Sequence, residues 1–125
     1  MKPQDKQHRF LQLDREAQRR AVGLAAETEF QHPDPLGAGE SIPMHSHPED
    51  NIYYVTGSAD FTVFAKDGKT MIENCRIGDG QAYNAVFIPG GMNHGWTNAV
   101  AGTRIWDVQY EERVEKMMEP ALACA

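Results

Sequence analysis

The segment His45-Ser46-His47, followed later in the chain by Pro89-Gly90-Gly91-Met92-Asn93-His94, decides how this sequence is interpreted. Side chains alternate between the two faces of a β-strand, so two histidines one residue apart on an extended segment point the same way. They can hold one cation between two imidazoles, and a third histidine beside a Pro-Gly-Gly turn can close the site from a neighbouring strand. Three neutral imidazoles suit zinc, iron, copper or nickel. The two segments therefore predict a metal site inside a small β-barrel.

The composition is that of one globular domain. The chain has 125 residues, 41% hydrophobic and 24% charged, which suits a single ordinary core. Its net charge of −6 argues against a nucleic-acid partner, because phosphate backbones attract basic surfaces. No apolar run approaches the length of a membrane span, so we expect no membrane partner. The polar stretch 1–10 has no apolar export signal, so we expect a cytoplasmic protein.

Short strands are predicted from Ile42 onward, each bounded by turn residues. The predicted strands cover residues 51–56, 61–66, 70–76, 85–88, 94–98 and 103–110. Asp67-Gly68 predicts a hairpin turn, since both residues tolerate positive φ. Many short strands at close spacing favour a sandwich or a barrel. Metal ligands on two separated strands favour a closed barrel, whose interior can hold a small cavity.

The two ends of the chain are less regular. Residues 14–26 fit a helix capped by Asp14, while residues 21–30 fit one strand of a sheet equally well, and both interpretations stay open. Residues 111–118 predict a short amphipathic helix, because Val114, Met117 and Met118 fall on one face. The expected organisation is one domain over 1–125, with an N-terminal arm (1–30), a barrel core (36–110) and a C-terminal helix (111–118).

Two longer motifs around the histidines resemble the two signatures of the cupin superfamily. Residues 39–57 resemble the first, which is Gly, five residues, His-x-His, three or four residues, Glu, six residues, Gly. Residues 89–98 resemble the second, which is Pro-x-Gly, two residues, His, three residues, Asn. The resemblance to small single-domain cupins implies an all-β, cupin-type jelly-roll β-barrel. It also implies that His45, His47 and His94 bind one divalent transition metal ion, namely iron, zinc, manganese or nickel.

The chain departs from this resemblance at the fourth ligand, where the family has a glutamate. Asn51 lies four residues after His47 on the same strand face, whereas Asp50 matches the family spacing back from Gly57, and Glu49 is close by. An amide oxygen is a weak neutral ligand, so Asn51 would leave the ion's charge largely uncompensated, while a carboxylate would hold the ion more firmly. We favour three histidines as ligands, with Asn51 as a distant fourth ligand or a hydrogen-bonding neighbour, and Asp50 stays open.

The resemblance implies a metal-dependent enzyme that acts on a small polar molecule with a carboxylate, hydroxyl or carbonyl group. Lewis-acid lyase or isomerase chemistry and iron-dependent dioxygenation all fit. The alternatives are a cupin that binds or senses a small ligand without catalysis, and one that has lost its metal. Tyr53, Phe87 and Trp96 are the candidate pocket residues, and they also fit core packing. We expect a homodimer, as is common among proteins of this resemblance, because sheet edges need cover.

Overall fold

The computed structural model describes residues 7–26, 34–109 and 113–117. In chain order its elements are β1 (Arg9–Leu11), α1 (Arg15–Ala26), β2 (Ile42–His45), β3 (Asn51–Thr56), β4 (Ser58–Phe64), β5 (Met71–Gly78), β6 (Ala85–Ile88), β7 (Asn93–Thr97) and β8 (Arg104–Gln109). Residues 113–117 are also helical. No helix among the described residues is long and apolar enough to cross a membrane.

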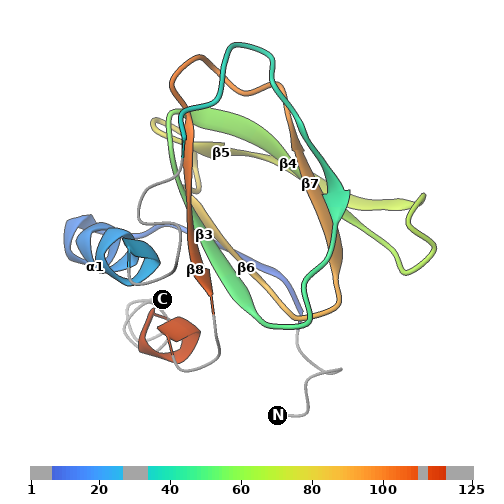
Figure 1. The fold of residues 1–125 in the computed structure, drawn as a ribbon, viewed down its shortest axis with the longest axis horizontal. Coiled ribbons are helices and arrows are strands. Elements are labelled where there is room, and N and C mark those ends of the chain that lie inside the picture. Colours follow the sequence, from blue (N-terminus) through green and yellow to red (C-terminus); the bar gives the residue numbers. More distant parts are fainter. Residues whose placement is uncertain (1–6, 27–33, 110–112, 118–125) are drawn as a thin grey trace.

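Two antiparallel four-stranded sheets face one another (Figure 1). One has the strand order β1-β6-β3-β8 and the other β2-β7-β4-β5, so the chain passes repeatedly from one sheet to the other. The strands predicted at 51–56 and 85–88 have those bounds, and the others are shifted by a few residues at their ends. This arrangement confirms the predicted all-β jelly-roll class, built as a sandwich of two sheets with α1 packed outside it.

The β1-β6-β3-β8 sheet is buried on both faces, and β3 shows why. Ile52 and Tyr54 face outward and belong to a cluster with α1 and with the helical residues 113–117. Tyr53 and Val55 face the opposite sheet and belong to a second cluster between the sheets. Successive side chains of a strand alternate between faces, so one strand contributes to two cores. Figure 1 shows α1 and the C-terminal helical turn lying outside this sheet.

The helical interpretation of the N-terminal arm is correct. Asp14 caps α1, because the backbone N–H of Ala17 donates a hydrogen bond of 2.9 Å to its Oδ1. The strand interpretation is wrong over residues 21–26, which are helical, and its remaining residues lie outside the described part of the chain. A C-terminal helix is present at 113–117, where Val114 and Met117 are buried as predicted. Met118 lies outside the described residues.

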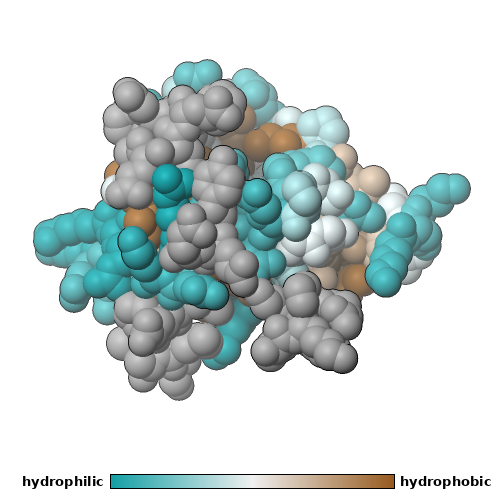
Figure 2. All heavy atoms as spheres, turned by 60° about the horizontal axis from the view of Figure 1, so that its bottom comes forward, coloured by the Kyte–Doolittle hydropathy of each residue, from teal (hydrophilic) through white to brown (hydrophobic). Residues whose placement is uncertain are grey.

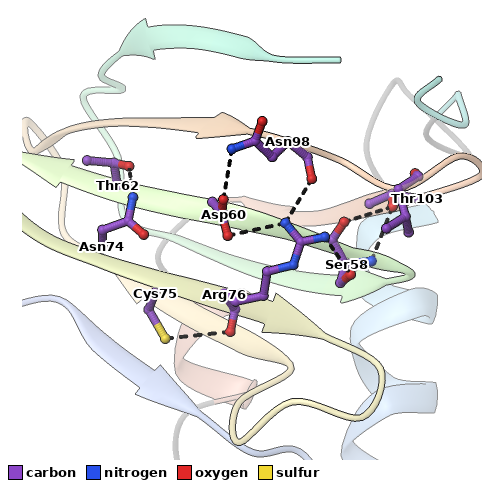
Figure 3. A network of polar contacts seen from close by, with 9 residues as sticks. Ser58, Asp60, Thr62, Asn74, Cys75, Arg76, Asn98 and Thr103 are labelled. Atoms are coloured by element: carbon purple, nitrogen blue, oxygen red, sulfur yellow. Dashed lines mark hydrogen bonds and ion pairs between the residues drawn. The ribbon is translucent and has the colours of Figure 1, made fainter. Parts of the chain in front are cut away.

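A polar network lies on the outward face of β4 and β5 (Figure 3). The guanidinium of Arg76 donates hydrogen bonds to Asp60 Oδ1 at 3.2 Å, to the Asn98 carbonyl at 2.8 Å and to Ser58 Oγ at 3.0 Å. Asn98 in turn donates to the other oxygen of Asp60. Asn98 directly follows β7 and has a φ of 55°, a conformation that asparagine tolerates better than most residues. The network thus joins two strands to the connection that follows β7.

The exposed surface is mainly polar. Figure 2 shows hydrophilic residues over most of the described surface in that view, with smaller hydrophobic areas between them. The large apolar side chains with the greatest exposure are Met44, Met71, Ile72, Tyr83 and Val100. Scattered apolar residues of this kind are normal on protein surfaces, so they do not identify the functional site.

Candidate metal centre

The structure brings His45, His47 and His94 together. His45 ends β2 and lies directly opposite His94 of β7 in the antiparallel pair, beside an irregularity in the β2 register. His47 follows two residues after His45, and its ring centroid lies 4.7 Å from that of His45. One nitrogen from each of the three rings lies within 4.8 Å of the others. The strand pairing thus supplies the convergence that the sequence motifs predicted.

Backbone carbonyls fix the orientation of two of the rings. Nδ1 of His45 lies 2.8 Å from the Pro43 carbonyl, and Nδ1 of His94 lies 2.9 Å from the Met92 carbonyl. A carbonyl oxygen only accepts hydrogen bonds, so each Nδ1 carries the hydrogen and each Nε2 keeps a free lone pair when the ring is neutral. Metal-binding histidines in proteins are commonly held by such bonds. These two rings are therefore prepared to bind a cation through Nε2.

Burial keeps two histidines of the cluster neutral. His94 is fully buried, and desolvation lowers its pKa to about 4, assisted by the neighbouring His45 and His47 and opposed by the bond to the Met92 carbonyl. Burial and the nearby His45 also lower the pKa of His47. Protonated imidazole cannot bind a metal, so a lowered pKa leaves these side chains available as ligands at neutral pH.

The turn that precedes His94 is locked to the loop that follows His47. The Gly91 N–H donates to the His47 carbonyl at 2.6 Å, and the Gly90 N–H donates to Asp50 Oδ1 at 2.9 Å. A Cβ at position 90 would lie 2.3 Å from the Pro48 carbonyl oxygen, which explains the glycine there. Asp50 therefore holds the two histidine-bearing loops together, and the cluster of converging donors does not include it.

Asn51 is buried close to the cluster but is bonded to another residue. Its Nδ2 donates to Asp107 Oδ1 at 2.6 Å, and Gln109 Nε2 donates to Asp107 Oδ2 at 2.7 Å. Asn51 Oδ1 is buried without a hydrogen-bond partner in the described structure. Burial raises the pKa of Asp107, against the opposing effects of its hydrogen bonds and of His47 and His45. A buried acceptor without a partner is unusual and marks a position suited to a ligand's donor group.

Sequence reasoning missed Asp107 and Gln109. They lie directly opposite Tyr53 and Asn51 in the β3–β8 pair, so their side chains share the face that carries those residues. Nothing in the local sequence around 104–109 marks them, because β8 pairs with a strand some fifty residues earlier. The order of strands in the sheet was the missing information.

Of the three candidate pocket residues, two lie on the histidine side of the sheet. The hydroxyl of Tyr53 lies 3.0 Å from His47 Nε2 and 2.9 Å from His94 Nε2. Trp96 packs edge-on against Tyr53, with ring centroids 5.7 Å apart, and is buried beneath it. Phe87 requires a correction. It alternates along β6 with Val86 and therefore faces α1, in the cluster on the other side of the sheet.

A surface hollow lies elsewhere. It has a volume of about 430 Å³ and is lined by Arg15, Gln18, Arg19, Val22, Tyr54, Thr56 and Trp106. Tyr54 faces away from the histidines, so this hollow lies between α1 and the outward face of the β1-β6-β3-β8 sheet. The donor chemistry, and not the hollow, identifies the histidine cluster as the candidate metal centre.

Comparison with known proteins gives the fold. No protein-family model and no curated protein matches the chain. A conserved protein of unknown function from Streptococcus pyogenes is 24% identical, with a TM-score of 0.47, over 62% of this chain and 60% of the other. KdgF from Halomonas sp. is 21% identical, with a TM-score of 0.46, over 58% and 59%. YcfD, a ribosomal oxygenase from Escherichia coli, is 18% identical, with a TM-score of 0.51, over 70% of this chain and 27% of its own.

Sequence identities this low support a conclusion about the fold alone. The matched regions span at most about three fifths of the length of these proteins. The architecture is the cupin fold, as the two histidine motifs implied. Within it lies a group of three histidines, of which His94 is buried, that could hold a single metal ion.

Proposed function

We propose that this protein is a metal-dependent cupin enzyme in which His45, His47 and His94 bind one divalent transition metal ion. The substrate is a small polar molecule with a carboxylate, hydroxyl or carbonyl group. The observation that carries the proposal is the arrangement of the donors: one nitrogen from each ring lies within 4.8 Å of the others, and two of the rings are held with Nε2 unprotonated. Core packing alone does not require three imidazole nitrogens to converge on one point, whereas a shared metal ion does.

The donor set also favours one kind of chemistry. The three neutral imidazoles leave the ion's positive charge uncompensated, since the converging group contains no carboxylate from the described residues. When bound, the ion supplies Lewis-acid polarisation of a carbonyl or carboxylate, or a site for oxygen activation if it is iron. The chain itself supplies acceptors beside the cluster, because Asn51 Oδ1 has no hydrogen-bond partner among the described residues and Asp107 carries a carboxyl group. A substrate with both an anionic group and a hydroxyl fits these surroundings.

Metal stoichiometry tests the binding step. Metal-free protein is incubated separately with zinc, manganese, nickel and anaerobic ferrous ions, desalted, and analysed by inductively coupled plasma mass spectrometry. We expect about one ion per chain for at least one of these metals, and loss of that ion in His47→Ala. His8→Ala is the matched control, because His8 bonds to Glu73 and is not one of the converging donors. Absence of retained metal in the native chain, or equal retention in His47→Ala, would refute the proposal.

A screen for substrate conversion distinguishes an enzyme from a binding protein. The metal-loaded protein is screened against small hydroxy acids, oxo acids and diketones, with oxygen consumption followed alongside product formation. Metal-dependent conversion that His47→Ala lacks supports the enzyme. Tight binding of one of these compounds, with no conversion at any loaded metal, supports the alternative of a ligand-binding or sensing cupin.

A further inference from the structure

The hydroxyl group of Tyr53 occupies an unusual position between two of the histidines. It lies 2.9 Å from His94 Nε2 and 3.0 Å from His47 Nε2. The Nδ1 bond to the Met92 carbonyl leaves His94 Nε2 with a lone pair, so Tyr53 donates its hydrogen to His94. His47 Nε2 then acts as the donor to the same oxygen. The phenol oxygen thus lies among the nitrogen atoms that would bind the ion.

These distances match the spacing of neighbouring donor atoms around a single ion. With bonds of about 2.1 Å, two donors at a right angle to each other are about 3.0 Å apart, and two at the tetrahedral angle are about 3.4 Å apart. The two measured separations from the Tyr53 oxygen agree with the right-angle value. An ion bound by His47 and His94 through Nε2 would therefore have this oxygen within reach, without a large movement of the strand.

The sequence candidates for the fourth position are bonded elsewhere. Asp50 accepts the Gly90 N–H, and Asn51 donates to Asp107. Tyr53 lies two residues beyond Asn51 on the same face of β3, and Trp96 and Phe61 pack around its ring. Those contacts hold the ring in place and direct its hydroxyl towards the histidines. A hydroxyl oxygen has a lone pair to give to an ion whether or not it keeps its proton.

We propose that the Tyr53 oxygen is the fourth protein ligand of the metal, in the role that a glutamate has in the family signature. This inference rests on the proposed metal site and adds a ligand to it. The ion replaces the hydrogen bonds that now join the oxygen to the two imidazoles. With an oxygen from β3, two histidines from the 45–47 segment and one from β7, the ion would be held by strands of both sheets.

Two substitutions on neighbouring residues test this ligand. Tyr53→Phe removes the oxygen and keeps the ring, and Tyr54→Phe makes the same chemical change on the opposite face, where the Tyr54 hydroxyl bonds to Gln18. We expect Tyr53→Phe to raise the metal dissociation constant at least tenfold and Tyr54→Phe to change it less than twofold. Dissociation constants come from competition with a chromophoric chelator, and circular dichroism confirms that both variants are folded.

A metal-soaked crystal of the native protein supplies the second readout, located by anomalous scattering. We expect the Tyr53 oxygen at about 2.0–2.2 Å from the ion. An oxygen more than 3 Å away, or equal metal affinity in Tyr53→Phe and Tyr54→Phe, overturns the ligand role while leaving the three-histidine site intact. Failure of the native chain to bind any metal overturns the proposed function together with this inference.

Discussion

His94 has the most constrained side chain of the cluster. It is fully buried, its Nδ1 is bonded to a backbone carbonyl and its Nε2 to Tyr53, and its ring contacts Phe61. In the folded protein its pKa is lowered to about 4, mainly by burial. The unfolded chain has a histidine pKa of about 6.5. The free energy of unfolding of the metal-free protein therefore depends on pH through this residue.

The sign of that dependence follows from proton uptake. Between pH 6.5 and 4, position 94 is mostly protonated in the unfolded chain and mostly neutral in the folded protein. The free energy of unfolding therefore falls as the pH is lowered. From pH 7.5 to pH 5 we expect a loss on the order of 2 kcal/mol from His94. The lowered pKa of His47 acts in the same direction and the raised pKa of Asp107 in the opposite one. Urea unfolding of metal-free native protein and His94→Gln at both pH values isolates the contribution. An equal loss in the variant would contradict this account.

At the residue scale the sequence predicted the three-histidine group better than its surroundings. The three histidines could be found because their motifs are local and the alternation of a strand orients His45 and His47 alike. Phe87 was misplaced because a run of four apolar residues, 85–88, gives no hint of which face is which when both faces are buried. Asp107 was missed because its relation to Asn51 depends on the register of two strands distant in sequence.

The elements next to the histidines are two loops that depend on one another. Asp50 accepts the Gly90 N–H, and the Gly91 N–H is bonded to the His47 carbonyl. The position of His47 relative to His94 is therefore set by this contact as well as by the sheets. The sequence showed that both loops carry motifs, and it predicted the strands around them from alternation and turn residues. It did not show that the loops bind each other, because that contact joins residues 40 apart.

Removing the loop contact should weaken metal binding without removing any ligand proposed here. For Asp50→Ala we expect a metal dissociation constant about tenfold higher, the effect typical of residues that support ligands. Glu49→Ala is the control, because Glu49 is an exposed neighbour on the same loop. Chelator competition measures both variants. A complete loss of metal in Asp50→Ala would show instead that its carboxylate binds the ion.

At the scale of the whole molecule, we expect the contacts that stabilise the fold to be separate from those that set metal affinity. The Arg76 network joins β4 and β5 to the connection after β7, on the outward face of their sheet, while the histidines lie between the sheets. Arg76→Met keeps much of the side-chain volume and removes three hydrogen bonds. Because the guanidinium is partly exposed, we expect a loss of only about 1–2 kcal/mol in the free energy of unfolding, with unchanged metal affinity.

Denaturant titration and chelator competition on the same preparation check both parts of that expectation. Arg20→Met is the matched control, since the ion pair of Arg20 within the described residues is an exposed one with Glu16 at 3.4 Å. A change below about 0.5 kcal/mol is expected there. A tenfold change in metal affinity in Arg76→Met would mean that the far end of the sheet sets the geometry of the histidines, and the separation would fail.

Strand β3 belongs to two cores, with Ile52 and Tyr54 on the helix side and Tyr53 and Val55 on the histidine side. Substitutions at its odd and even positions are therefore limited by different requirements. We expect mutations at 52 and 54 to change mainly the stability of the fold. Mutations at 51 and 53 should change what the candidate metal centre binds, while the contacts on the helix side persist. A laboratory evolution experiment can exploit this. A library that randomises positions 51, 53, 107 and 109 varies the chemistry of the centre on a constant support.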